Sequence, residues 1–139
     1  MKTPTLTRRR LLACALLAGV ATSGLADDWT AAEISPAELR ARSAADAAAI
    51  VILDVRTAEE FAAGHVPGAI NIPVDQVKAR LAELEPSKDK TIVTYCRSGR
   101  RAATALATLH AAGYGKLAHL TGDMPGWEKS QEEATADSQ

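Results

Sequence analysis

Short apolar runs alternate with helix-like segments along most of this chain of 139 residues. The run at 49–55 is apolar except for Asp54, a pattern typical of a parallel strand buried on both faces of its sheet. Three more strands are predicted at 69–72, 91–95 and 117–120. Alternation of strands and helices at this spacing predicts a single α/β domain, with a mostly parallel sheet covered by helices on both faces.

Local signals place the ends of two helices. The segment Ser35-Pro36-Ala37-Glu38 has the form of a capping box with proline at the first helical position, which predicts a helix from Pro36 to about Ala45. Thr57-Ala58-Glu59-Glu60 is a second capping box, and Gly64 can end the short helix that it begins.

The second half of the chain contains two longer helix patterns and a polar end. Helices are predicted from Asp75 to about Leu84 and from the loop at 96–101 to Ala112, followed by a helical turn at 125–129. Residues 130–139 have no apolar side chain other than alanine, so we expect a disordered tail after a domain that spans 27–129.

The first 26 residues have the pattern of a secretory signal peptide. A basic start at Lys2 and Arg8-Arg9-Arg10 precedes an apolar stretch, and Gly24-Leu25-Ala26 offers small residues for cleavage. The stretch is too short and too rich in small residues for a transmembrane helix. Thr7 to Leu12 also resembles the twin-arginine export signal, so both export routes stay open. We therefore expect a periplasmic protein without a stable membrane anchor.

Cleavage after Ala26 would change the charge and the cysteine content of the chain. The segment carries four basic side chains and no acidic one, so the formal net charge of −1 becomes −5 without it. Such an acidic protein has no general attraction for nucleic acid. Cleavage also removes Cys14 and leaves Cys96 as the single cysteine, which excludes an internal disulfide and a cysteine-based metal site.

Cys96 lies where a predicted strand ends and a predicted helix begins. At a helix start the backbone N–H groups are unpaired, and the helix dipole adds partial positive charge. Arg97, Arg100 and Arg101 bring full positive charges within five positions of the cysteine. Both effects stabilise a thiolate, the nucleophilic form of cysteine, and favour an anionic ligand beside it. The alternative is a buried, inert thiol, and the surrounding arginines argue against it.

Asp54 stands near the end of its predicted strand, as Cys96 does after the strand at 91–95. Ligands of parallel sheets bind beyond the carboxyl ends of the strands, so Asp54 and Cys96 can face the same pocket. We interpret Asp54 as a buried carboxylate that needs partners, with Arg56 or loop N–H groups as candidates. Structural or solvated roles are expected for the three histidines, His65, His110 and His119.

Four motifs occur in order along the chain. They are Ile52 to Arg56, the segment Glu60-Phe61 with Gly64 to Pro73, the segment Tyr95 to Arg101, and Leu120-Thr121-Gly122 with Gly126-Trp127. In this order and at these separations they resemble the single-domain rhodanese family of sulfurtransferases, over nearly all of the chain after residue 27. The resemblance implies a rhodanese-like domain with a five-stranded sheet.

The resemblance also implies a two-step sulfur transfer that needs no cofactor and no metal. Cys96 would attack the outer sulfur of thiosulfate, release sulfite, and pass the sulfur from a persulfide to cyanide or a thiol. The predicted donor site is the rest of the loop: Arg97, Ser98, Gly99, Arg100 and Arg101. Arg97 and Arg101 are preferred for the oxyanion end of the donor, because a guanidinium matches that geometry. Asp54 and Arg56 are expected to stabilise the loop without contacting the donor.

Two other functions stay open. A sulfur carrier that holds the persulfide for a redox or sulfur-relay partner fits the small, single-domain size. A phosphatase is disfavoured, because related phosphatases have arginine six positions after the cysteine and position 102 here is Ala. Asp123 stands where the rhodanese family commonly has a second glycine after Gly122. We expect this carboxylate to add negative charge at the pocket rim and to weaken anion binding.

Overall fold

A computed structural model describes residues 28–139, and the expected signal peptide lies outside the described residues. In the described part, one sheet contains β1 (Ala32–Ile34), β2 (Ile50–Asp54), β3 (Ile70–Asn71), β4 (Thr91–Tyr95) and β5 (Leu117–Leu120). Their order across the sheet is β1-β5-β4-β2-β3, and every pairing is parallel. The predicted α/β class with a five-stranded sheet is confirmed, and the sheet is parallel throughout.

The strands that the sequence located best lie in the middle of the sheet. Leu53 of β2 and Ile92 and Val93 of β4 are fully buried, because helices cover both faces there. The pattern had not indicated β1, which is short, lies at the sheet edge and buries only Ile34. Edge strands with one buried residue leave almost no periodic signal in the sequence.

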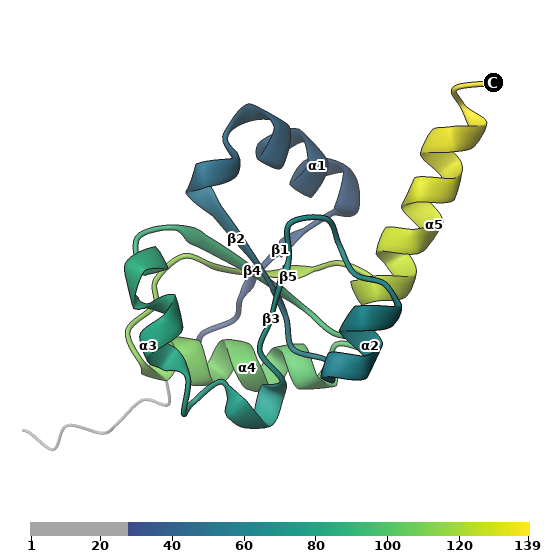
Figure 1. The fold of residues 1–139 in the computed structure, drawn as a ribbon. Helices are drawn as coiled ribbons and strands as arrows, with labels where there is room; N and C mark the ends of the chain where they lie inside the picture. The colour runs from purple at the N-terminus through teal and green to yellow at the C-terminus, as the bar shows by residue number, and fades with distance from the viewer. Residues whose placement is uncertain (1–27) are drawn as a thin grey trace, which may run out of the picture.

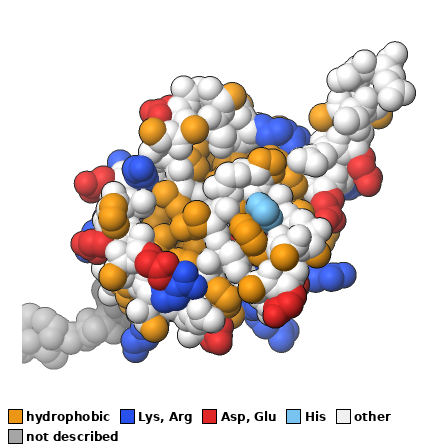
Figure 2. Space-filling model, viewed as in Figure 1, with side chains coloured by type: hydrophobic (Ala, Val, Ile, Leu, Met, Phe, Trp, Pro, Cys, Tyr) orange, Lys and Arg blue, Asp and Glu red, His pale blue; other side chains and the backbone are white. Residues whose placement is uncertain are grey.

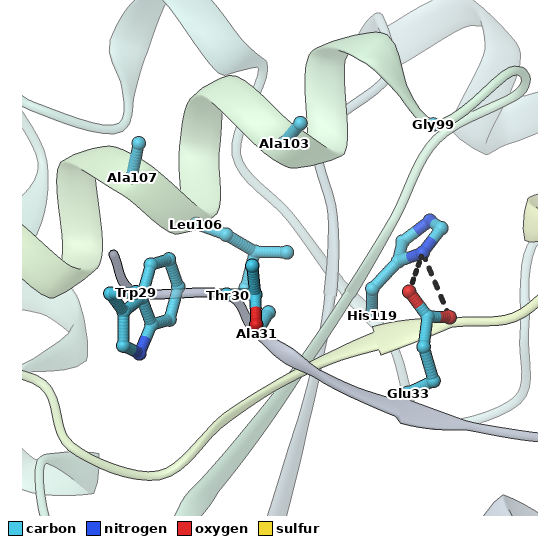
Figure 3. A pocket seen from close by; sticks show the side chains of 9 residues that line it. All are labelled: Trp29, Thr30, Ala31, Glu33, Gly99, Ala103, Leu106, Ala107 and His119. Atoms are coloured by element: carbon cyan, nitrogen blue, oxygen red, sulfur yellow. Dashed lines mark hydrogen bonds and ion pairs between the residues drawn. The ribbon is translucent and has the colours of Figure 1, made fainter. Parts of the chain in front are cut away.

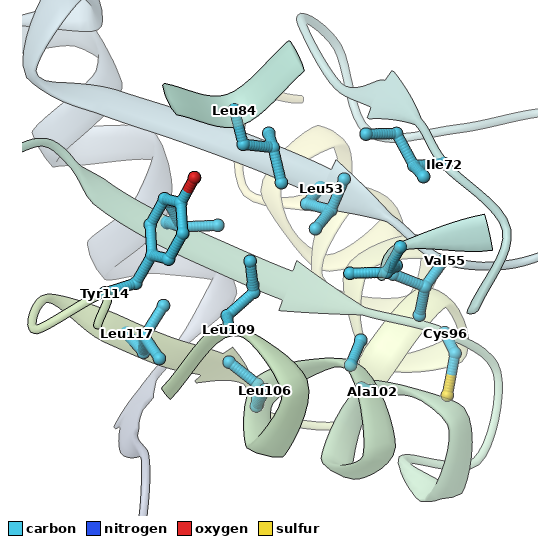
Figure 4. Close-up of a cluster of buried hydrophobic side chains, with 13 residues drawn as sticks. Leu53, Val55, Ile72, Leu84, Cys96, Ala102, Leu106, Leu109, Tyr114 and Leu117 are labelled. Atoms are coloured by element: carbon cyan, nitrogen blue, oxygen red, sulfur yellow. The ribbon is translucent and has the colours of Figure 1, made fainter. Parts of the chain in front are cut away.

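Helices cover both faces of the sheet, with different helices on each face (Figure 1). The helices α1 (Pro36–Ala45) and α5 (Asp123–Ala136) pack on one face through Leu39, Met124 and Trp127. On the other face lie α3 (Leu81–Leu84) and α4 (Arg100–Ala111), with α2 (Ala58–Ala63) near the start of α4. Figure 4 shows the cluster beneath α4, in which the Cys96 sulfur lies at one end of a row of aliphatic side chains.

Both predicted capped helices form. The hydroxyl of Ser35 accepts the Glu38 N–H at the start of α1, and Thr57 and Glu60 complete a reciprocal capping box at α2, which ends at Gly64. The segment predicted as one helix at 75–84 is instead a 3-10 turn, Val74–Gln76, and the short α3.

The structure also differs from the expected disordered tail at 130–139, because α5 continues to Ala136. The start of α5 is held by Trp127, whose ring lies 4.8 Å beneath the Arg40 guanidinium, and Arg40 also donates to the Ser130 carbonyl at 3.2 Å. The exposed residues that follow are mainly Glu, Gln and Ala, which extend a helix once it is anchored. These residues lack apolar side chains for a core, yet their helix propensity is high enough to continue α5.

On the face shown in Figure 2, acidic and basic side chains are interspersed around a central apolar area. None of the helices described at 28–139 is long and apolar enough to span a membrane. Within the same residues, no cluster of three or more His, Cys, Asp or Glu side chains is arranged to hold a metal ion.

Candidate active site

The predicted loop at 96–101 lies between β4 and α4, but only residues 96–99 connect the two elements, because Arg100 and Arg101 already form the first turn of α4. Gly99 is the residue before α4 and has φ 88°, a left-handed conformation that favours glycine. This conformation turns the Gly99 N–H toward the cysteine, and it donates to Cys96 Sγ at 3.1 Å. An N–H aimed at sulfur from the positive end of a 12-residue helix stabilises negative charge on that sulfur.

Cys96 is held by its backbone from the start of α5. Its N–H donates to Asp123 Oδ1 at 2.9 Å, and its carbonyl accepts the Met124 N–H at 3.0 Å. The residue is fully buried. Cys96 is therefore fixed by residues that follow it by 27 and 28 positions, and no local pattern in the sequence indicated this contact.

The three arginines of the loop have different environments. Arg97 and Arg100 are exposed, as is Ser98. Arg101 is half-buried and forms a two-pronged ion pair with Glu60 of α2, with N···O distances of 2.7 and 3.0 Å. Arg101 thus ties the start of α4 to α2.

The ion pair of Arg101 and Glu60 also interacts electrostatically with Cys96. Hydrogen bonds from Arg101 and the Thr57 backbone lower the pKa of Glu60 from 4.5 to about 2. The pKa of Arg101 is raised, first by its hydrogen bonds to Glu60 and, to a smaller degree, by Cys96. Glu60 was part of a recognised motif but had not been singled out as a site residue. The capping box at the start of α2 accounts for a glutamate at position 60 by local sequence alone. The contact of Glu60 with Arg101 could therefore not be predicted from the sequence.

Asp54 and Arg56 form a separate buried network. Asp54 is fully buried and accepts hydrogen bonds from the Arg56 N–H, the Arg56 guanidinium at 2.7 Å and the Tyr95 hydroxyl at 2.7 Å. Arg56 also donates to the Gly64 carbonyl at 2.7 Å. The predicted partnership of Asp54 with Arg56 is present. The side chain of Tyr95 belongs to the core cluster on the α1 and α5 face, however, whereas Cys96 belongs to the cluster on the α4 face. Asp54 therefore lies behind the loop and holds the ends of β2 and β4 together.

Asp123 does not lie at the pocket rim, where the sequence analysis placed it. It is 4% exposed and points beneath the loop, with His119 Nε2 at 3.0 Å from Oδ1. Burial raises the pKa of Asp123, but the hydrogen bonds from His119 and from the Cys96 N–H outweigh it and the pKa is lowered. His119, expected to be solvated or part of the core, instead contacts the Asp123 carboxylate.

A groove of about 340 Å³ runs between α4 and the N-terminal segment beside the loop. Figure 3 shows His119 near Gly99 at one end and Trp29 at the other, with Ala103 and Leu106 of α4 along its wall. The groove is mostly apolar and has one polar end at the loop, where Glu33 lies beside His119. Its size suits a small organic molecule.

The family model for the rhodanese-like domain matches residues 35–130. The chain belongs to the rhodanese-like domain family.

Relatives of the chain have names that describe sulfur chemistry. A sulfurtransferase of Allochromatium vinosum is 36% identical over 85 residues, which are 61% of this chain and 78% of that protein. The thiosulfate sulfurtransferase PspE of Escherichia coli is 44% identical over 62 residues, 45% of this chain and 60% of its own length. The structure of the human single-domain sulfurtransferase TSTD1 has a TM-score of 0.61 at 28% identity and covers 72% of this chain and 97% of its own. These relatives support sulfur transfer as the general chemistry of this rhodanese-like chain.

Proposed function

We propose that the protein is a sulfurtransferase that takes sulfane sulfur from thiosulfate onto Cys96 and transfers it to cyanide or a thiol. The observation that carries this proposal is the Gly99 N–H at 3.1 Å from Cys96 Sγ, at the start of α4. A persulfide is anionic, and a helix start with an N–H aimed at the sulfur is an environment that stabilises an anion. The name of the Escherichia coli relative adds support for thiosulfate as the donor.

The proposed reaction has two half-reactions. In the first, the Cys96 thiolate attacks the outer sulfur of thiosulfate, the S–S bond of the donor breaks, and sulfite leaves with the bonding electron pair. In the second, the carbon of cyanide or a thiolate acceptor attacks the outer persulfide sulfur. Thiocyanate or an acceptor persulfide leaves, and the Cys96 thiolate is restored.

The three arginines at 97–101 have different roles in this proposal. Arg97 and Arg100 are exposed beside the loop and attract the anionic donor to it. Arg101 holds the loop against Glu60 and adds positive charge next to the sulfur. The preferred oxyanion contact in the sequence analysis was Arg97 or Arg101. The ion pair with Glu60 favours Arg97 for direct contact with the donor.

We also propose that the protein acts after export to the periplasm, on the signal-peptide pattern of residues 1–26. Fractionation of a bacterial host that expresses the full chain tests this, together with the N-terminal sequence of the product. Export predicts a periplasmic protein that begins near Asp27. A cytoplasmic protein that retains its first residues would contradict the proposal.

Intact-mass measurement tests the chemistry directly. Excess thiosulfate should add one sulfur atom, about 32 Da, to the reduced protein, and cyanide should remove it. The matched variants Cys96→Ser and Cys96→Ala should gain no mass. An accessible, reduced Cys96 that gains no sulfur would exclude thiosulfate as the donor.

A second candidate is a sulfur carrier, which the complete burial of Cys96 favours because a buried persulfide is shielded from unintended acceptors. Steady-state formation of thiocyanate separates the two functions. An enzyme turns over many times with thiosulfate and cyanide. A carrier takes up one sulfur per chain and releases it only to a particular partner protein.

A further inference from the structure

Three charged side chains lie together beside the cysteine loop, and their geometry fits one protonation state. The ring of His119 lies between two carboxylates, with Nδ1 at 3.2 Å from Glu33 and Nε2 at 3.0 Å from Asp123. A neutral imidazole has a single N–H and can donate to only one of them. An imidazolium donates to both. The arrangement is therefore that of a protonated histidine between two anions.

Asp123 connects this cluster to the nucleophile. Its Oδ1 accepts the Cys96 N–H at 2.9 Å, and its Oδ2 lies 3.2 Å from the position that a Cβ on Gly99 would occupy. Gly99 is the residue whose N–H donates to the sulfur. The carboxylate thus lies directly beneath both residues that define the sulfur site.

The negative charge of Asp123 matters because water does not screen it. The side chain of Asp123 is 6% exposed, whereas that of Glu33 is 61% exposed and can be solvated when His119 is neutral. Loss of the His119 proton to solvent changes the net charge of the three groups from −1 to −2. A buried carboxylate without its counter-charge repels both a thiolate and an anionic donor.

We propose that Asp123 and His119 are positioning residues for the sulfur donor: Asp123 holds the Cys96 loop, and protonated His119 cancels the negative charge that Asp123 places beneath it. This inference rests on the proposed function, in which the donor is an anion. It predicts that reaction with thiosulfate weakens when His119 loses its proton.

In the described part of the chain, the charged groups that face His119 come from two elements. Glu33 from β1 and Asp123 from α5 are the charged groups that contact the ring, and both raise its pKa, to about 8, with Asp123 the larger cause. The other neighbouring positions carry no charge: Thr94 of β4, and Gly99 and Ala103 at the start of α4.

The first test measures the rate of Cys96 persulfide formation with thiosulfate between about pH 6 and 10 in the wild type and in Asp123→Asn. Asparagine keeps an acceptor for the Cys96 N–H and tolerates φ 54°, the left-handed conformation of Asp123. Effects of pH that do not involve Asp123 are common to both proteins, so the pH dependence of the ratio of their rates reports the His119 step. We expect Asp123→Asn to become faster than the wild type by about threefold to tenfold as the pH rises through about 8.

Two more variants complete this test. His119→Gln should be slower than the wild type below about pH 8 and match it above, since its side chain is never charged and the wild-type ring is neutral there. His110→Gln is the matched histidine control, since His110 lies at the opposite end of the 12-residue α4 from Gly99. It should follow the wild-type profile. A rate ratio of Asp123→Asn to wild type that stays constant with pH would overturn the inference.

A second readout does not depend on sulfur transfer. In heteronuclear NMR spectra of the full domain, the Cys96 amide should titrate in the wild type with the same midpoint as the His119 ring, and this step should vanish in Asp123→Asn. If thiosulfate loads none of the variants while the shared midpoint is present, the choice of donor is wrong and the linkage of His119 to Cys96 stands. If the Cys96 amide does not follow His119, the linkage itself is refuted.

Discussion

The substitution Asp54→Asn should destabilise the fold strongly, although it changes one atom. Oδ2 of Asp54 accepts hydrogen bonds from the Arg56 guanidinium and from the Tyr95 hydroxyl, each at 2.7 Å. In asparagine, one of the two oxygens becomes an amide NH₂ group. If the amide nitrogen takes the position of Oδ2, it faces two other donors, the Arg56 guanidinium and the Tyr95 hydroxyl. Arg56 also loses Asp54, its only ion-pair partner among residues 28–139.

The expected loss follows from burial. Removal of one partner from a buried ion pair typically costs about 3–5 kcal/mol, because the remaining charge is left uncompensated. Arg56 is 7% exposed and keeps its hydrogen bond to the Gly64 carbonyl, so we expect the lower end of this range, about 3 kcal/mol. For a domain of this size, that loss lowers the melting temperature by roughly 10–15 °C.

Urea unfolding followed by circular dichroism and tryptophan fluorescence measures this loss. Asp75→Asn is the matched control, because Asp75 is exposed and the same change there should stay within about 0.5 kcal/mol of the wild type. Adding Arg56→Met to Asp54→Asn should recover part of the stability, since it removes the unpaired charge. A loss below about 1 kcal/mol for Asp54→Asn would refute the interpretation of the network as a buried, mutually dependent pair.

Three further predictions concern other parts of the fold. The folded pKa of Glu60, about 2, lies below its ordinary value of 4.5, so its ion pair with Arg101 stabilises the protein above about pH 4.5 and is lost as the pH falls toward 2. Glu60→Gln should therefore reduce stability at pH 7 by about 1–2 kcal/mol, a value discounted for partial exposure, and should flatten the acid limb of a stability–pH curve. Gly99→Ala should lower stability by about 1–2 kcal/mol and slow persulfide formation, because φ 88° strains a side chain and its Cβ would meet Asp123 Oδ2 at 3.2 Å. A crystal structure of that variant with an unchanged loop would contradict this. Trp127→Ala should cost about 3–5 kcal/mol in chemical unfolding, since the buried ring anchors α5 to the sheet, and retained stability would show that α5 contributes little.

The sequence alone determined those features that depend on near neighbours. Apolar runs located β2 and β4, caps at Ser35 and Thr57 placed the starts of α1 and α2, and the position of Cys96 between a strand and a helix located the loop. Each of these signals is read within a few residues, because backbone hydrogen bonding and capping are local.

The tertiary structure alone decided which side chains support the loop. Glu60 meets Arg101 across 41 positions, Glu33 meets His119 across 86, and Asp123 meets the Cys96 N–H across 27. These contacts arise because the order β1-β5-β4-β2-β3 places β1 beside β5 and the start of α5 beneath the end of β4. A carboxylate at position 123 therefore looked like a rim charge in the sequence, and only the packing of α5 and β5 shows that it is buried, paired with His119 and hydrogen-bonded to the Cys96 N–H.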